Sequence, residues 1–259
     1  MPPEADDLYA AEADVYDLTT AAVSRLDVPF YRALAVDAGG PVLELGCGTG
    51  RVLLPCAEAA GAAAGAAAGV DASAAMLAHA RARVAAAGLA GRVELHHADM
   101  REVRLGRSFP LVTIPFRSLF HLRTDRDWLA ALATVRAHLA TGGRFAADVF
   151  VPDPAATRTR RAVTDPGTGH RIAVLERIGY DTARQVATRR RVVEVLDPGG
   201  RVLDRRERLM PIHYRWPEQV LRLLARAGFT VEQAFGGFDG RPLDAAAEEL
   251  IWVATARPG

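Results

Sequence analysis

The sequence contains no lysine, because all 32 of its basic residues are arginine. A phosphate-binding P-loop needs a lysine, so this class of nucleotide site is excluded. Cysteine is also scarce. The two cysteines, Cys47 and Cys56, match neither a zinc-ligand spacing nor a disulfide framework, which is typical of proteins of the reducing cytoplasm. We therefore expect a cytoplasmic protein without a metal site.

Long apolar runs are missing as well, although 50% of the residues are hydrophobic. None reaches the roughly 18 residues of a membrane-spanning helix. Residues 1–17 are acidic and lack a basic stretch followed by an apolar one, so we expect no signal peptide. The net charge of +1 requires neither nucleic acid nor a membrane surface as a partner. The length of 259 residues suits one elaborated domain or two small ones.

The segment VLELGCGTGR, residues 42–51, is the strongest local signal. Its apolar first half predicts a buried parallel strand. Three glycines follow at every second position and allow a sharp turn with close approach to a ligand: Gly46, Gly48 and Gly50. Thr49 is expected to cap the next helix. The dinucleotide fingerprint GxGxxG would need its third glycine where Arg51 stands, which disfavours a nucleotide-dependent oxidoreductase.

Acidic residues end the next two predicted strands. Asp71 follows Val70, and a carboxylate there can accept bonds from both hydroxyls of a ribose. Asp99 and Met100 follow the predicted strand Val93–His97. Because parallel strands end at one edge of a sheet, both acids are expected beside the glycine turn.

Several of these motifs have counterparts in one family. The string E-x-G-x-G-x-G, from Glu44 to Gly50, resembles motif I of the class I S-adenosylmethionine (SAM)-dependent methyltransferases. DASAAML at Asp71 resembles the family's continuation D-x-S-x-x-M-L, and HLATGGRF resembles L-x-P-G-G, with Thr141 in place of the proline. The resemblance covers about residues 14–257. Its motifs are specific for SAM binding and much less so for the substrate.

The resemblance implies an α/β fold with a Rossmann-like, doubly wound, seven-stranded sheet in the order 3-2-1-4-5-7-6. It also implies an N-terminal helical lid and an inserted antiparallel β-sheet. The expected division is a lid over residues 1–40, a SAM-binding core over 41–151, an insert over the substrate pocket at 152–215, and a C-terminal helix and strands at 216–259.

The insert is expected to begin with a loop over residues 152–168, which are rich in Pro, Thr and Arg. Three strands are predicted after it: His170–Tyr180, Gln185–Leu196 and Arg201–Tyr214. The DPGG between the last two is a strong hairpin signal. The run Arg189–Arg191 is interpreted as one solvated face of a strand.

The resemblance implies SAM as the cofactor and S-adenosylhomocysteine as its product. In the family, a lid tyrosine reaches the amino-acid end of SAM, a methionine packs on the adenine, and an acid accepts from its amino group. Carried over, the cofactor-binding residues are Tyr16, Tyr31, Glu44, Gly46, Cys47, Gly48, Gly50, Asp71, Ala72, Met76, Asp99, Met100 and Pro115. The tyrosines and Met76 can also be read as packing residues.

The loop PFRSLFHL after the fourth predicted strand is expected beside the reacting methyl group. His121 is placed similarly to a histidine of deoxyamino-sugar N,N-dimethyltransferases and is the candidate base, although it could simply bond to backbone. The candidate substrate-binding residues are Arg117, Ser118, His213 and Tyr214.

The favoured activity is transfer of the methyl group, in line, to an amine nitrogen of a small metabolite such as an amino sugar or a natural-product intermediate of secondary metabolism. Two alternatives stay open: methylation of a small hydroxyl or carboxyl group, and SAM binding without methyl transfer. The oligomeric state is open too, with a homodimer as one option.

Overall fold

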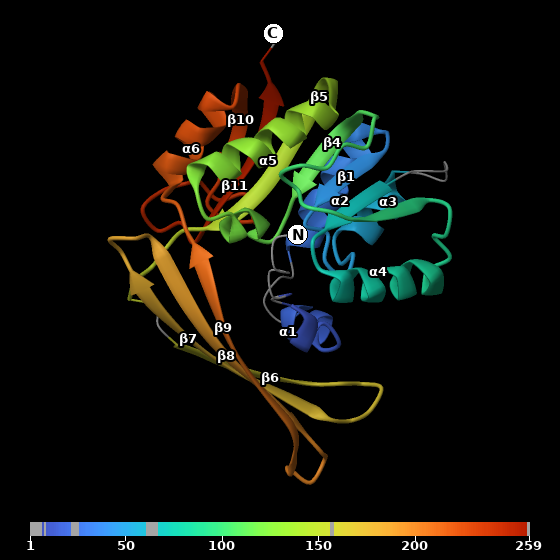
Figure 1. Ribbon diagram of the computed structural model, residues 1–259, viewed down its shortest axis with the longest axis vertical. Coiled ribbons are helices and arrows are strands. Elements are labelled where there is room, and N and C mark those ends of the chain that lie inside the picture. Colours follow the sequence, from blue (N-terminus) through green and yellow to red (C-terminus); the bar gives the residue numbers. More distant parts are fainter. Residues whose placement is uncertain (1–6, 8, 22–25, 61–66, 156–157, 258–259) are drawn as a thin grey trace.

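The computed structural model describes Asp7 and residues 9–21, 26–60, 67–155 and 158–257 (Figure 1). Residues 1–6 and 8 of the acidic start, and all of residues 61–66, lie outside the described residues. Among the described residues, no helix combines the length and the apolar character that crossing a bilayer requires.

A seven-stranded sheet forms the core in the order β3-β2-β1-β4-β5-β11-β10. Its strands are β1 (Val42–Leu45), β2 (Ala67–Asp71), β3 (Val93–His97), β4 (Phe109–Ile114), β5 (Leu139–Phe150), β10 (Phe229–Phe235) and β11 (Glu249–Ala256). All pairings are parallel except those of β11 with β5 and β10. The predicted order 3-2-1-4-5-7-6 is confirmed, since β11 is the seventh strand of this sheet in the chain and β10 the sixth.

Helices cover both faces, so the central strands are buried on both sides and read as nearly continuous apolar runs, which in β1 only Glu44 interrupts. Helices α2 (Asp27–Ala38) and α3 (Leu53–Ala59) pack against one face, where Val42 and Leu111 lie side by side. Helices α5 (Asp125–His138) and α6 (Pro217–Arg226) cover the other face, and α4 (Ala74–Ala86) packs on β2 and β3. Helix α2 begins two residues before Pro29, whose missing N–H costs nothing in a first turn.

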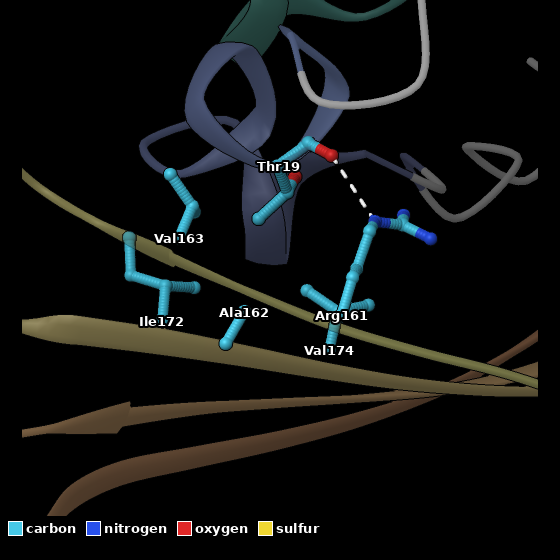
Figure 2. A pocket seen from close by; sticks show the side chains of 6 residues that line it. All are labelled: Thr19, Arg161, Ala162, Val163, Ile172 and Val174. Carbon is cyan, nitrogen blue, oxygen red and sulfur yellow. Dashed lines mark hydrogen bonds between the residues drawn. The ribbon is translucent and has the colours of Figure 1, made fainter.

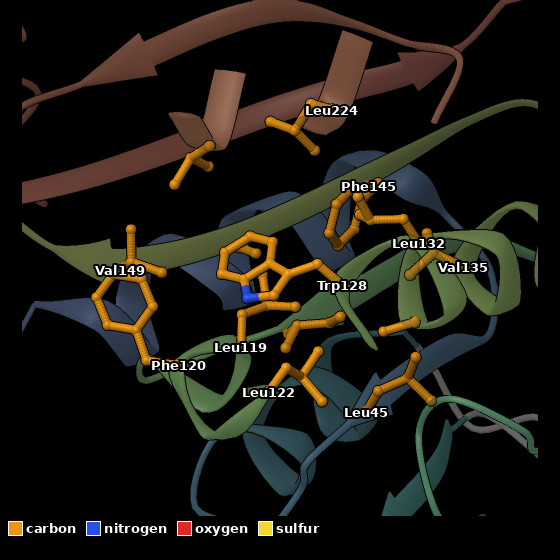
Figure 3. Packing of buried hydrophobic residues seen from close by; sticks show 14 of the residues in the cluster. Leu45, Leu119, Phe120, Leu122, Trp128, Leu132, Val135, Phe145, Val149 and Leu224 are labelled. Carbon is orange, nitrogen blue, oxygen red and sulfur yellow. The ribbon is translucent and has the colours of Figure 1, made fainter. Parts of the chain in front are cut away.

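The largest apolar cluster lies between the sheet, α5 and the short helix η2 (Ser118–His121), as Figure 3 shows. Trp128 of α5 is fully buried, and the Phe120 ring packs 6.2 Å from it and 5.0 Å from Phe150. Because Leu119 and Phe120 are anchored in this cluster, the next residue, His121, is held at a fixed place beyond the end of β4.

A separate antiparallel sheet projects from the core (Figure 1). Its strands, in the order β6-β7-β8-β9, are β6 (Arg158–Thr164), β7 (Arg171–Asp181), β8 (Val186–Leu196) and β9 (Val202–His213). The prediction of a loop over 152–168 is wrong for β6, which pairs with β7 over seven positions. As an edge strand with three arginines and two threonines, it has no apolar alternation that would mark it in the sequence.

The interpretation of Arg189–Arg191 as one solvated face is also wrong. Successive residues of a strand point to opposite faces, so Arg190 is exposed while Arg191 is only 4% exposed. The inner face of this sheet meets the N-terminal segment, defined as Asp7 and residues 9–21, which contains η1 (Ala10–Glu12) and α1 (Tyr16–Ala21). Figure 1 shows α1 between the four-stranded sheet and the core.

Candidate active site

The glycine turn lies at the carboxyl end of β1, against the loop after β4. Gly46 has a φ of 76°, and a Cβ added there would lie 2.9 Å from Cβ and Oγ of Ser118 and 3.3 Å from Cε of Met100. Gly50 has the same φ, and a Cβ there would collide with the side chain of Leu54. Only glycine allows this backbone path, so the sequence forms a close-fitting cradle where a ligand can approach main-chain atoms.

Thr49 does not cap the next helix, so that prediction is wrong. Helix α3 begins at Leu53, and its N-cap Val52 makes no side-chain capping bond. The Thr49 hydroxyl instead donates to Asp17 of α1 over 2.6 Å, and Arg83 donates to the same carboxylate over 2.8 Å. The N-terminal segment is thereby tied to the rim of the glycine turn.

Asp71 connects the end of β2 to this turn. Its carboxylate accepts the N–H of Gly48 over 2.7 Å and that of Ser73 over 2.8 Å. Burial raises the pKa of Asp71 against the effect of these two bonds. Met76, one turn into α4, places its Cε 3.4 Å from where a Gly48 Cβ would lie. The carbonyl of Ala72 lies 3.0 Å from Nε2 of His97.

Asp99 and Met100 follow β3 on the same edge. The Arg101 guanidinium binds Asp99 through Nε at 3.0 Å and Nη2 at 2.6 Å, and its Nη1 lies 2.8 Å from Asp127. Burial by itself raises the pKa of Asp99, but the bonds from Arg101 outweigh it and hold that pKa below its usual value. No local pattern in the sequence indicates that an arginine two residues away shares this carboxylate.

Two buried carboxyl groups lie under the site. Glu44 of β1 is 2% exposed, and its Oε2 has no hydrogen-bond partner among the described residues. Burial raises the pKa of Glu44 well above its usual range. Asp148 of β5 is 1% exposed and accepts both the Tyr31 hydroxyl, over 2.6 Å, and the N–H of Phe116, over 2.8 Å. The hydroxyl of Tyr31, which was predicted to bind the cofactor, is therefore bonded to a buried carboxyl of the protein itself.

Burial raises the pKa of Asp148 to about 7. A raised pKa means that the folded state binds the proton more tightly than the unfolded state, so this stabilisation is complete below about pH 4 and is lost as the pH rises through 7. Between about pH 5.5 and about pH 8, the wild type should lose about 2 kcal/mol of unfolding free energy that the Asp148→Asn variant does not lose. Urea unfolding of both proteins at the two pH values measures this, and parallel pH dependences would contradict it. The side-chain amide of the variant can still accept both bonds, because they end on the same oxygen of Asp148.

The loop after β4 has an unusual backbone. Phe116 and Arg117 have φ values of 55° and 66°, which cost non-glycine residues roughly 1–3 kcal/mol each. Asp148 holds the first of them, an ion pair with Glu249 holds Arg117, and Ser118 Oγ donates to the carbonyl of Pro115 over 2.8 Å. Such strain is concentrated at functional sites.

Aromatic rings from the N-terminal segment cover this loop. The Tyr16 ring packs edge-on against Phe116 at 6.5 Å and against Tyr9 at 5.8 Å. Burial raises the pKa of Tyr16, so it stays protonated. The Tyr9 hydroxyl lies 2.8 Å from Nε2 of His121. Tyr9 is not among the predicted site residues, because a single aromatic ring in an acidic stretch gives no local signal.

His121 is neutral at neutral pH. Burial lowers its pKa to about 4, and the charges of Arg189, Arg208 and His213 act in the same direction. A base works best when its pKa is near the working pH, so His121 in this setting is a weak proton acceptor. Its position, beside the strained loop and facing the four-stranded sheet, still makes it the group closest to the expected chemistry.

Other predicted residues are placed differently. Cys47 lies on the turn, but its side chain is buried under β2, so only its backbone faces the site. Tyr214 is fully buried and packs edge-on against Tyr180 and Trp216, within the core at the base of the four-stranded sheet. His213 precedes it and is partly buried. Among the described residues, no group of three His, Cys, Asp or Glu side chains could hold a metal ion.

A small hollow lies away from the glycine turn, where α1 meets β6 and β7 (Figure 2). Its lining is mostly apolar, with Val163, Ile172 and Val174 opposite Thr19. Arg161 closes one side by donating from Nε to the Thr19 carbonyl over 3.3 Å. The hollow is a gap in the packing of the N-terminal segment on the sheet, and Arg161 is the one titratable side chain among the described residues that line it.

Residues 42–143, from β1 to the start of β5, match the model of a methyltransferase domain family. A dTDP-3-amino-3,4,6-trideoxy-alpha-D-glucopyranose N,N-dimethyltransferase of Streptomyces venezuelae is 31% identical over 89% of this chain and 95% of its own. The chain is a class I SAM-dependent methyltransferase.

Solved structures agree with this assignment. The CcbJ methyltransferase from Streptomyces caelestis superposes with a TM-score of 0.78 at 25% identity, over 98% of this methyltransferase and 100% of CcbJ. SAM-bound CalS10, an amino pentose methyltransferase from Micromonospora echinaspora, gives a TM-score of 0.72 at 26% identity, over 93% and 96% of the two chains. The cofactor of the methyltransferase is therefore SAM. SAM carries a positive charge on its sulfonium and another on its ammonium group. These charges suit the buried carboxyl of Glu44, whose Oε2 is unpaired among the described residues.

Proposed function

We propose that this methyltransferase transfers the methyl group of SAM to the amine nitrogen of a small amino sugar. The observation that carries the proposal is the Tyr9–His121 pair, which joins the N-terminal segment to the strained loop after β4. Support comes from the relatives, since two amino-sugar N,N-dimethyltransferases of Streptomyces are each 31% identical to this chain. Enzymes of this kind serve secondary metabolism, and the two buried, free cysteines suit the cytoplasm.

We assign the parts of the chain accordingly. Residues 1–40 are assigned as a lid that α2 anchors on the core sheet. Residues 41–151 are assigned as the SAM-binding core, 152–215 as an insert that closes the acceptor pocket, and 216–259 as the part that completes the core sheet. The lid assignment is supported by the bonds of Asp7 to Ser73 and of Asp17 to Thr49, which cross the mouth of the glycine turn.

SAM supplies an activated methyl group when it is bound. Among the residues of this chain, Asp71 would hold the ribose, while Met76, Asp99 and Met100 would hold the adenine. Glu44, with the backbone of Gly46, would lie at the amino-acid end. The remaining contribution of the protein is alignment in line with the acceptor, which can supply up to about 7–11 kcal/mol of a transfer barrier.

An amine attacks only in its neutral form. His121 is unprotonated at neutral pH, so in the tautomer whose Nε2–H donates to Tyr9 its Nδ1 can accept a hydrogen bond from the amine. Tyr9 lies within hydrogen-bond distance of the same imidazole and fixes the orientation of the ring. Arg117 is occupied by Glu249, so its contribution to the acceptor pocket is through its backbone and its packing over Phe150.

Transfer of labelled methyl from SAM to matched acceptors tests the proposal. An amino sugar should be methylated, while the same sugar with a hydroxyl in place of the amine should not. His121→Asn should lower kcat by roughly 10–100-fold and leave SAM affinity unchanged. His96→Asn, at a partly exposed histidine of β3 that lies beside Glu94, is the matched control and should behave as wild type.

If the hydroxyl analogue were methylated and the amino sugar were not, the enzyme would be an O-methyltransferase. The same site residues could serve that reaction. SAM binding without any product across amine, hydroxyl and carboxyl acceptors would show a binding protein instead.

A further inference from the structure

The loop between β4 and η2 contains two adjacent residues in the left-handed region of backbone space. Phe116 and Arg117 have φ values of 55° and 66°. Among the described residues, Gln185 is the one other non-glycine residue with a positive φ, and it lies in the turn between β7 and β8. Large side chains adopt this conformation only where surrounding contacts impose it. The shape of the loop is therefore set by neighbouring elements.

Two acids on adjacent strands supply such contacts. Asp148 of β5 accepts the N–H of Phe116 over 2.8 Å. Glu249, the first residue of β11, binds the guanidinium of Arg117. Strand β11 pairs with β5 so that Glu249 stands opposite Phe150. The hydrogen bonds of the core sheet thus fix the backbone of both acids, and each acid can act as a rigid anchor for one of the left-handed residues.

The contact made by Glu249 has no substitute in the described part of the chain. Arg117 is the N-cap of η2 and makes no side-chain capping bond. Nε of Arg117 and Oε2 of Glu249 are buried and have no hydrogen-bond partner among the described residues. The bond from Nη2 of Arg117 to Oε1 of Glu249 is the one hydrogen bond that this guanidinium makes to them. Removal of Glu249 therefore releases the side chain of Arg117.

Arg117 is connected to His121 by two routes. The carbonyl of Arg117 accepts the N–H of Phe120 over 2.9 Å, within η2. The Arg117 guanidinium also lies 5.5 Å from the centre of the Phe150 ring, which packs 5.0 Å from the Phe120 ring. His121 is the next residue in the chain. The backbone and the packing of Arg117 therefore both influence where the imidazole lies.

The cofactor side of the same loop is held by other residues. Ser118 lies against the glycine turn, where it would contact a Cβ at Gly46 at 2.9 Å. The ring of Phe116 lies 4.8 Å from the Arg51 guanidinium and meets the edge of Tyr16. None of these contacts involves Glu249. Loss of Glu249 should therefore disturb the His121 side of the loop more than the SAM side.

We propose that Glu249 is a positioning residue of methyl transfer, which acts through Arg117 to hold the left-handed loop and His121 where they align the acceptor with the methyl group of SAM. This inference rests on the proposed function, because it places the acceptor at His121. A displacement of about 1 Å can cost roughly 100-fold in rate, so a modest relaxation of the loop is sufficient.

Steady-state kinetics of Glu249→Ala test the role. The variant should lose about 100-fold in kcat, whereas KM for the acceptor and the Kd for SAM should stay within about threefold of wild type. Glu249→Gln keeps the bonding oxygen and should lose only about tenfold in kcat. Glu248→Ala is the matched control, because this neighbouring acid is 81% exposed in an ion pair with Arg241, and it should behave as wild type.

The Arg117→Gly background tests the route of the effect. Glycine adopts a positive φ without steric cost, and it offers no side chain for Glu249 to hold. In this background Glu249→Gln should change kcat by less than about twofold, because the two residues act as one unit. The same tenfold loss in both backgrounds would show that Glu249 does not act through Arg117, and would overturn the proposal.

Hydrogen exchange of the SAM-bound protein, measured by mass spectrometry, reports on the loop without turnover. Glu249→Ala should speed exchange about tenfold in peptides that cover residues 116–121 and leave peptides of β4 unchanged. Glu248→Ala should exchange as wild type does. If Glu249→Ala does not fold, Glu249→Gln decides the matter, with a smaller increase in the same peptides.

The kinetic comparison uses whichever acceptor the wild type methylates, amine or hydroxyl, so failure of the amine assignment does not affect it. Wild-type kcat in Glu249→Ala, or a loss that appears in SAM affinity or in KM instead of kcat, would overturn the positioning role. Wild-type exchange in the loop would overturn it too. If the wild type methylates no acceptor, the proposed function fails, while exchange still decides whether Glu249 holds the loop.

Discussion

Replacing Asp71 with alanine is expected to weaken SAM binding by at least about 100-fold. The carboxylate is the proposed acceptor for the ribose hydroxyls, and it also holds the N–H groups of Gly48 and Ser73. Its removal therefore takes away a ligand contact and loosens the glycine turn at the same time. Calorimetric titration with SAM and with S-adenosylhomocysteine measures the effect.

Two further variants make the result specific. Asp71→Asn keeps one oxygen acceptor and should lie between wild type and Asp71→Ala. Asp165→Ala is the matched control, because Asp165 also accepts a backbone N–H and a neighbouring hydroxyl in a turn, far along the chain in the insert. It should bind SAM as wild type does. Wild-type affinity in Asp71→Ala would mean that the ribose lies elsewhere.

Arg51→Met is expected to lower the free energy of unfolding by about 3–5 kcal/mol. The Arg51 guanidinium binds both oxygens of Asp27, at 2.9 and 2.5 Å, and the Asp27 side chain is 2% exposed. Loss of the arginine leaves a buried carboxylate without its counter-charge. Urea unfolding measured at neutral pH gives the value directly.

The double variant Arg51→Met/Asp27→Asn should recover much of this loss, because it no longer contains an unpaired buried charge. Arg190→Met breaks an exposed pair with Glu207 on the outer face of the insert and should cost less than about 1 kcal/mol. Equal costs for Arg51→Met and Arg190→Met would show that burial of Asp27 does not govern the pair.

The strands of the core and the glycine turn could be predicted because their signals are local, whereas the strand order and the cofactor followed from the resemblance that these local motifs carry. Glycine spacing, apolar runs and the acids that end β2 and β3 are all read within a few residues. The structure shows why the pattern is strict, since a side chain at Gly46 would collide with Ser118, 72 positions later in the chain.

The features that the sequence did not reveal depend on distant partners. Thr49 bonds to Asp17 rather than to a helix end, and Tyr9 meets His121 across 112 positions. The edge strand β6 is fixed by pairing with β7, not by its own pattern. Arg191 is buried only because Glu12 and Glu176 neutralise it from two other elements. The sequence contains the residues of these pairs, but no local pattern shows which of them come into contact.

The N-terminal segment bonds to both sides of the site through four carboxylates. Asp7 meets Ser73 and Asp17 meets Thr49 and Arg83 on the core side, while Glu12 meets Arg191 and Asp14 meets Arg206 on the insert side. One short stretch of chain therefore bridges the glycine turn and the insert. A substitution in it changes contacts on both sides at once, whereas a substitution on the outer part of β8 or β9 changes the insert alone.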